Sequence, residues 1–297
     1  MRDARKDRKR RGIPLERVES REKYSELQSA AKQQGFARFT NNYLNMDAVE
    51  RYIGLGRMEY EWDGGGLYLY TDEGPFYRLY IRCGENGIKL SEREKPVLVR
   101  NVYREGSKGE ALQDVEGQLR RLGFTQYSRS AQILAAPLEN RENVSEKLRK
   151  AEKFLARFGL RITYADRSQL EDIFRLRDQE PDLKPYHFSY ETMEEKERAI
   201  EKGYFRCVVN AENKLCAAQQ FSVERNGIQG NWLAVETDYK EKYGIGAAMA
   251  YHSFAYAIER NIGNYFGWLE RDNEKSLRYH QSIGYRLTGK VAEDWVR

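Results

Sequence analysis

The sequence is poor in the residues that build metal sites and disulfide frameworks. It has only three histidines and three cysteines, and the cysteines (Cys83, Cys207 and Cys216) lack the spacing of zinc ligands or disulfide pairs. No run of about 18 apolar residues occurs, so no segment is predicted to span a membrane. The N-terminus has no apolar stretch of the kind that directs export. We therefore expect free thiols in a reducing cytoplasm and no bound metal.

Charge is distributed unevenly along the chain. Residues 1–11 carry seven basic and two acidic side chains, and their net charge of +5 equals that of the whole protein. The rest of the chain is therefore balanced. A basic run of this kind is usually a solvated tail. Contact with RNA or another anionic surface is the alternative, although no helix-turn-helix, zinc or stacking-aromatic motif accompanies the run.

The pattern of apolar residues predicts an α/β protein with a mixed sheet. In the first half, helices are expected at 16–34, 46–55 and 109–122, with strands at 67–70, 76–83, 96–103 and 124–135. The second half follows the order β-α-α-β-β-β-α-β-α-β-β, with closing strands near 285–289 and 292–296. Strands separated by helices imply a sheet with helices on its faces.

The chain contains an internal repeat. Residues 97–127 and 265–287 share one layout, in which a strand ends in a polar loop, a helix follows, and Gly-Phe or Gly-Tyr starts the next strand. The first half therefore resembles a shortened copy of the second. We divide the chain into a basic arm with a polar helix (1–35), a degenerate first domain (36–138), a helical connector (139–159) and a complete second domain (160–297).

The join between "WLAVETDYKEKY" and "GIGAAMAYHSFAYAIE" is the most informative stretch. A strand runs into a loop that holds Gly244 and Gly246, and a helix of small residues starts at once. Glycine lets the backbone approach a ligand closely, and the N–H groups at a helix start bind phosphate. By itself the pattern fits a tight turn without a ligand equally well.

A second motif follows in the right order: Asn273, Ser276, Tyr279, His280, Gly284 and Tyr285. Together the two motifs resemble the GNAT superfamily of acyl-CoA-dependent N-acyltransferases. The resemblance covers 160–297 well and 40–136 in outline, and implies a tandem of two GNAT-like halves. It also implies that acetyl-CoA (coenzyme A) binds the second half. The residues it assigns to the cofactor are Leu233, Ala234, Val235, Lys240, Lys242, Tyr243, Gly244, Ile245, Gly246, Ala247, Ala248, Asn273 and Ser276.

Two departures from the family pattern stand out. Glu241 occupies the position of an Arg or Gln and would repel pyrophosphate, so Lys240 or Lys242 is expected to compensate. His280 occupies the position of a tyrosine that protonates the departing thiolate. Helical geometry places Tyr279 on the stripe that packs on the sheet and turns His280 toward the cofactor. Both residues are candidates for the catalytic site, together with Glu236. A protonated imidazole there can act as the acid. A histidine that only hydrogen-bonds a carbonyl is the open alternative.

The attacking amine must lose a proton, and a carboxylate at a strand end can accept it. Glu236 ends the strand before the glycine loop, while Glu270 and Asp272 end the neighbouring strand. Each of these three is also compatible with a solvated charge. The loop at 178–190 is expected to shape the acceptor pocket. Its aromatic residues, Tyr186, His187, Phe188 and Tyr190, form either a substrate wall or a small satellite core.

The leading interpretation is an N-acetyltransferase in which a primary amine of a small molecule or peptide attacks the thioester directly. Backbone N–H groups at the splayed strand would stabilise the oxyanion, as in the family. The first half lacks a glycine loop before a helix, so no cofactor is expected there. Two alternatives remain open. One is a Fem-like transferase that uses aminoacyl-tRNA and the basic arm at 1–11, and the other is a non-catalytic binding module.

Overall fold

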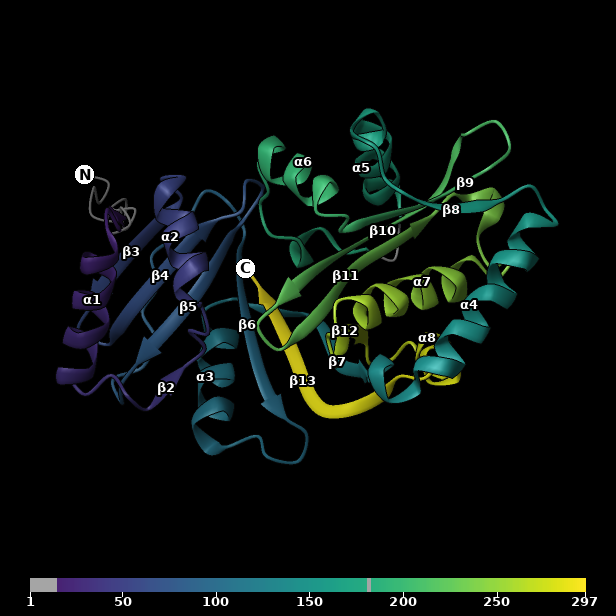
Figure 1. Cartoon of the computed structure of the whole chain (residues 1–297). Helices are drawn as coiled ribbons and strands as arrows, with labels where there is room; N and C mark the ends of the chain where they lie inside the picture. The colour runs from purple at the N-terminus through teal and green to yellow at the C-terminus, as the bar shows by residue number, and fades with distance from the viewer. Residues whose placement is uncertain (1–14, 181–182) are drawn as a thin grey trace, which may run out of the picture. The chain divides into compact units, whose positions relative to one another are not determined.

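The computed structural model describes residues 15–180 and 183–297, and the basic arm at 1–11 lies outside this part of the chain. The chain forms two units (Figure 1). Unit 1 contains the residues up to Arg129 together with Lys290–Arg297, and unit 2 contains Ser130–Gly289. The three cysteines have free thiols, as expected from their spacing, and all three are buried.

Unit 1 is built on a sheet with the strand order β1-β3-β4-β5-β6-β13, and β2 pairs with β5. Its elements are β1 (Glu16–Arg17), α1 (Arg21–Gln33), β2 (Phe39–Thr40), α2 (Met46–Gly54), β3 (Met58–Asp63), β4 (Gly66–Asp72), β5 (Tyr77–Cys83), β6 (Val97–Arg104), α3 (Glu110–Arg121) and the start of β7 (Thr125–Ala135). Helices α1 and α2 pack on one face of the sheet and α3 packs on the other.

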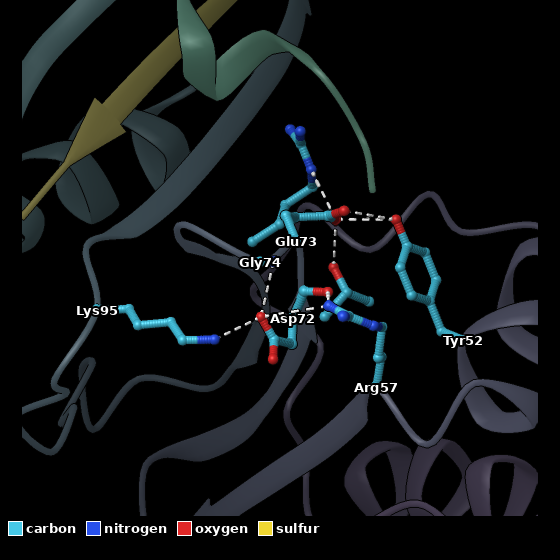
Figure 2. A network of polar contacts seen from close by, with 8 residues as sticks. Tyr52, Arg57, Asp72, Glu73, Gly74 and Lys95 are labelled. Atoms are coloured by element: carbon cyan, nitrogen blue, oxygen red, sulfur yellow. Dashed lines mark hydrogen bonds and ion pairs between the residues drawn. The ribbon is translucent and has the colours of Figure 1, made fainter. Parts of the chain in front are cut away.

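The β4–β5 hairpin turns through the sequence Asp-Glu-Gly-Pro at 72–75, and this turn carries a buried carboxylate (Figure 2). The side chain of Glu73 has no exposed surface. Its oxygens accept hydrogen bonds from the Tyr52 hydroxyl at 2.9 and 3.0 Å and from the Thr71 hydroxyl at 2.8 Å. Arg78 Nε lies 3.5 Å from the same carboxylate. These contacts satisfy a charge that would be costly to bury alone, and they tie α2 to the hairpin.

In unit 1 the parallel strands β5 and β6 part, and the chain fills the gap itself. Their pairing runs from Tyr77↔Val97 to Leu79↔Val99. Beyond that point Asn41 inserts: its Oδ1 accepts from Ile81 N–H at 2.6 Å, and its Nδ2 donates to the Leu79 and Arg100 carbonyls at 3.4 and 3.1 Å. Residues 84–96, all of them described, link the two strands without a helix. The side-chain amide of Asn41 therefore closes the gap in unit 1, with hydrogen bonds to the backbone of both strands.

Unit 2 has the strand order β7-β12-β11-β10-β9-β8. Its elements after β7 are α4 (Arg141–Ala156), β8 (Arg161–Tyr164), α5 (Leu170–Gln179), α6 (Met193–Glu201), β9 (Phe205–Val209), β10 (Leu215–Glu224), β11 (Gly227–Val235), α7 (Ile245–Glu259), β12 (Tyr265–Glu270), α8 (Glu274–Ser282) and the start of β13 (Arg286–Val296), with short 3-10 turns at Pro137–Asn140, Arg167–Gln169, Pro185–His187 and Thr237–Tyr239. Helices α5 and α6 lie on one face of the sheet, and α4 and α7 lie side by side on the other (Figure 1).

Each unit contains a strand segment from the other half of the chain. Residues 130–135 of β7 pair antiparallel with β12 of unit 2, from Tyr265↔Ala135 to Glu270↔Ser130. Residues 290–296 of β13 pair antiparallel with β6 of unit 1. The expectation of two closing strands is wrong, because one strand spans Arg286–Val296 and continues through Gly289, which has a φ of 77°. A glycine at this position permits the left-handed conformation without breaking the strand.

A fully buried arginine lies between β9 and α7 of unit 2. Arg206 Nε donates to His252 Nδ1 at 3.0 Å, and the guanidinium lies 3.9 Å from the centre of the Tyr164 ring. Burial, followed by the positive charge of Arg206, lowers the pKa of His252 to about 4. The neutral imidazole is therefore the form that accepts the hydrogen bond from Arg206, and His252 packs inside unit 2.

We expect the stability of the protein to decrease as the pH falls from about 6.5 to about 4. In this window the unfolded chain binds a proton at His252 that the folded chain excludes. His252 should reduce the free energy of unfolding by about 1–3 kcal/mol across the window. Urea unfolding at pH 7.5 and 5.0 measures the slope. His252→Gln keeps an acceptor for Arg206 and should flatten it, whereas parallel profiles for wild type and variant would contradict this origin.

No helix in residues 15–180 and 183–297 is both long and apolar enough to cross a membrane. Over the same ranges, histidine, cysteine and acidic side chains form no group of three that could hold a metal ion.

Candidate functional site

The candidate site of unit 2 is a gap between two parallel strands. β11 and β12 pair only at Ile228↔Tyr265 and Gln229↔Phe266, although both strands continue. On its other side, β11 pairs with β10 throughout, with Gln220↔Trp232 followed by Phe221↔Gly230. Asn231 therefore has no partner residue on β10 and forms a β-bulge. The bulge lies where β11 and β12 part. Bulges bend a strand and leave the extra residue's backbone unpaired.

The strand register identifies which backbone groups face the gap. Glu236 N–H donates to the Cys216 carbonyl at 2.9 Å, so the backbone of this position points toward β10. Backbone groups alternate along a strand. Ala234 therefore also points toward β10, whereas Leu233 and Val235 point toward the gap. Of the three residues that the family resemblance assigns to pantetheine, two present their backbone to the gap and Ala234 does not.

Helix α7 begins at the end of this gap without a side-chain cap. Its N-cap, Gly244, has the left-handed conformation (φ 62°, ψ 24°), and no side chain bonds to the first turn. The first N–H groups of a helix have no intrahelical acceptor. The N–H groups of Ile245, Gly246 and Ala247 are therefore oriented to bind an anion. Side-chain caps are present on α1, α2, α6 and α8, whereas α3, α4 and α5 begin without one, as α7 does.

The charged residues of the loop are engaged with other parts of unit 2. Lys240 Nζ lies 2.6 Å from the Glu180 carboxylate, and Lys242 Nζ donates to the Asp238 carbonyl at 2.8 Å. Glu241 forms an ion pair with Lys275 in the first turn of α8. The cation beside Glu241 is thus Lys275, which sequence reasoning missed. Its position two residues after the Asn273 cap is the signal that would have placed it near the loop.

Asn273 and Ser276 interact with each other at the start of α8. Asn273 Oδ1 accepts a hydrogen bond from Ser276 N–H at 2.9 Å, which makes Asn273 the helix cap. Ser276 also supplies the carbonyl that His280 contacts one turn later. In this structure both residues build α8, and a cofactor contact of either remains a prediction.

Tyr279 faces the start of α7. A Cβ placed on Gly246 would lie 2.7 Å from the Tyr279 hydroxyl oxygen and 3.7 Å from Leu233 Cδ2. The tyrosine hydroxyl, the first turn of α7 and β11 therefore meet at one point. Burial of the hydroxyl, with a contribution from Tyr251, raises the pKa of Tyr279. Tyr279 does more than pack on the sheet, since 37% of the residue is exposed and its hydroxyl lies at the start of α7, and its catalytic role stays a prediction.

His280 is held by its own helix. Its Nδ1 lies 2.8 Å from the Ser276 carbonyl, so Nδ1 carries the proton and donates it. The ring also packs edge-on against Tyr279 and Tyr285, at 5.2 and 5.3 Å. Burial lowers the pKa of His280, although the Ser276 carbonyl opposes the shift. The imidazole is therefore neutral at neutral pH and has Nε2 as a proton acceptor, which is the opposite of the predicted acid.

The predicted acidic groups lie away from the bulge. Glu236 follows Asn231 by five residues, which corresponds to about 16 Å of strand. Glu270 pairs with Lys184 at 3.0 Å, and Asp272 is exposed. A different carboxylate is connected to the bulge. Trp232 Nε1 donates to Gln220 Oε1 at 2.6 Å, and Gln220 Nε2 donates to the Glu191 carboxylate at 3.0 Å.

The sequence did not predict a role for Glu191, because Glu191 is connected to β11 only through the side chain of Gln220 on β10. No local pattern in the sequence indicates such a connection. In the segment before it, Phe188 packs against the core between α5, α6 and the sheet, under the Arg177 guanidinium. For Phe188 the satellite-core alternative is therefore the observed one.

Comparisons with known proteins identify the fold. No protein-family model and no curated protein matches the sequence. Among solved structures, a GCN5-related glucosamine N-acetyltransferase region of a fungal multi-domain GH3 β-N-acetylglucosaminidase matches with a TM-score of 0.57 and 9% identity, over 87% of this chain and 38% of that one. This chain thus spans well under half of that protein's length.

Two further structures match over most of both chains. A GCN5-related N-acetyltransferase from Sphaerobacter thermophilus has a TM-score of 0.52 and 9% identity, over 85% of this chain and 84% of that one. A Drosophila protein has a TM-score of 0.50 and 10% identity, over 95% and 97%. Both units, moreover, contain a parallel strand pair that parts, followed by the strand–helix–strand repeat. The chain therefore has the GNAT fold, in a tandem arrangement of two GNAT-like halves.

Proposed function

We propose that the chain is an acyl-CoA-dependent N-acyltransferase that transfers an acetyl group from acetyl-CoA to a primary amine, and that unit 2 carries the reaction. The observation that supports this most is the gap between β11 and β12, which opens onto the uncapped start of α7. Unit 1 has the same parting of parallel strands, but Asn41 occupies its gap. Within residues 15–180 and 183–297, unit 2 therefore combines an open strand gap with an uncapped helix start, whereas the gap of unit 1 is filled.

The residues of unit 2 fit coenzyme A. The backbone of Leu233 and Val235 would pair with the amide groups of the pantetheine arm, and the N–H groups at the start of α7 would hold the pyrophosphate. The absence of a side chain at Gly246 lets the Tyr279 hydroxyl approach the first turn of α7, where a Cβ would lie 2.7 Å from it. Glu241 does not prevent this fit, because Lys275 balances its charge.

The bound cofactor would supply a thioester, whose carbonyl carbon the amine attacks while the thiolate departs. The backbone N–H freed at the Asn231 bulge would stabilise the developing oxyanion. The Tyr279 hydroxyl, kept protonated by its raised pKa, would donate a proton to the leaving thiolate. The neutral His280 would support the orientation of Tyr279 through their edge-on contact. Glu191, oriented by Gln220 beside the bulge, would accept the proton of the amine.

Calorimetric titration with acetyl-CoA and with free coenzyme A tests the proposal, followed by assays of thiol release on a panel of primary amines. We expect saturable binding at a single site per chain and amine-dependent thiol release. A protein that binds neither form of the cofactor would overturn the proposal. Binding without turnover on any amine would leave only the non-catalytic alternative.

The two candidate bases are distinguished by matched substitutions. We expect Glu191→Gln to lower kcat by at least about 100-fold, since general base catalysis typically contributes 10²–10⁴-fold. Glu236→Gln, about 16 Å further along β11, should change kcat by less than about threefold. Both variants should bind acetyl-CoA like the wild type. If Glu236→Gln is the impaired variant, the sequence-based assignment of the base is correct and Glu191 has only a structural role.

A further inference from the structure

Two phenylalanines at the end of α4 are exposed beside the glycine loop. Phe154 and Phe158 are 43% and 49% exposed, and their rings contact edge-on at 5.1 Å. Phe158 also contacts the Tyr243 ring at 4.7 Å, and Tyr243 lies 6.0 Å from the Tyr239 ring. We name these four residues the aromatic platform. Exposed aromatic groups that adjoin one another typically mark a binding surface.

The platform is continuous with the proposed phosphate site. Tyr243 immediately precedes Gly244, the N-cap of α7, and has a left-handed φ of 59°. This conformation is unfavourable for a residue with a large side chain and is found preferentially at functional sites. It directs the Tyr243 ring onto Phe158, next to the free N–H groups of the helix. An aromatic surface and an anion site therefore lie one residue apart.

The border of the platform carries positive charge. Lys153 directly precedes Phe154, and Arg157 directly precedes Phe158. Both basic residues are exposed and lie beside the phenylalanines at the end of α4. Lys242 precedes Tyr243 in the loop. A planar apolar surface, free helix N–H groups and flanking cations form the combination that a phosphorylated purine nucleotide requires.

We propose that the aromatic platform binds the adenine base of coenzyme A, with Phe158 as the main stacking surface and the basic residues on its border facing the ribose phosphate. This inference rests on the proposed function, since it assigns the nucleotide end of the same ligand. It gives α4, which the sequence indicates only as a connector, a part in donor recognition. It also explains why two phenylalanines at the end of α4 remain exposed, although Val144 and Leu155 of the same helix are buried.

The test compares two ligands that differ only at the nucleotide end. Coenzyme A and 4′-phosphopantetheine share the pantetheine arm, but the second lacks the adenosine. We expect Phe158→Ala to weaken the binding of coenzyme A about tenfold, within the range measured for the loss of one base–aromatic stack. Its affinity for 4′-phosphopantetheine should not change. Phe158→Tyr should restore binding of coenzyme A, and Met193→Ala, which truncates an exposed side chain on α6, is the control.

A second measurement does not depend on affinity. Coenzyme A with an ethenoadenine base is fluorescent, and stacking should quench its emission on the wild type and not on Phe158→Ala. The inference is overturned if Phe158→Ala binds coenzyme A like the wild type, or if it weakens both ligands equally. A wild type that binds neither ligand overturns the proposed function and this inference together. A wild type that binds both ligands equally well overturns only the inference.

Discussion

Gly246→Trp should abolish the binding of acetyl-CoA, with a loss of at least about 100-fold in affinity, or about 2.7 kcal/mol. Even a single Cβ at this position would lie 2.7 Å from the Tyr279 hydroxyl. An indole would displace that tyrosine, cover Leu233 and fill the end of the gap between β11 and β12. The first N–H groups of α7 would then be screened from any phosphate. Calorimetric titration measures the loss directly.

The design separates a local steric effect from unfolding. Gly54→Trp, which introduces the same side chain at an open position at the end of α2, should leave binding unchanged. Gly246→Ala should weaken binding less, because the displaced atom is at the tip of a side chain that can move. Adding Tyr279→Phe to Gly246→Ala removes the closest atom and should restore part of the affinity. Wild-type binding by Gly246→Trp would place the cofactor elsewhere.

Local signals predicted the elements that surround the site. Gly244 and Gly246 correctly placed the start of α7, and Asn273 correctly placed the start of α8, because a helix boundary depends on residues close in sequence. The parting of β11 and β12 also agrees with the resemblance to the GNAT superfamily. The helix starts need only a short window of sequence, whereas the parting of the two strands was expected from the family resemblance.

Long-range pairing accounts for what the sequence did not predict. Nothing in residues 290–296 indicates that they pair with β6, nearly two hundred residues earlier. The insertion of Asn41 into unit 1 is equally invisible, because a single asparagine substitutes for a strand. The strand at 58–63 was missed despite its alternation of Met58, Tyr60 and Trp62 with acidic residues. Its inward-facing Glu61, buried against Arg93, obscured the pattern.

The roles of Tyr279 and His280 illustrate a different limit. A helical wheel gives the angle between two side chains but not the direction of the helix face, which depends on how α8 packs. In the structure, Tyr279 reaches the glycine loop, and His280 bonds to the Ser276 carbonyl. Burial in this packing raises the pKa of Tyr279 and lowers that of His280, and the proton donor itself stays a proposal. Sequence reasoning identified both residues but could not assign their chemistry.

Asp294→Ala should destabilise the protein by about 3–5 kcal/mol, because it leaves a largely buried arginine without its partner. Asp294 is fully buried in the segment of β13 that completes unit 1. Its carboxylate binds Arg100 through two hydrogen bonds of 2.7 Å and accepts a third from Ser128 at 2.8 Å. Burial opposes the charge of Arg100, but the bonds to Asp294 outweigh it and raise the pKa of Arg100.

Urea unfolding followed by circular dichroism measures this effect. Asp272→Ala removes an exposed carboxylate of the same kind and should change the free energy of unfolding by less than about 0.5 kcal/mol. Asp294→Asn, which keeps one acceptor oxygen and replaces the charged second oxygen with an amide donor, should lie between the two. A loss below about 1 kcal/mol for Asp294→Ala would mean that Arg100 reaches solvent or another partner once the carboxylate is gone. The large loss would instead show that unit 1 depends on a strand supplied by the last residues of the chain, and that its stability requires the exchanged strand to be in place.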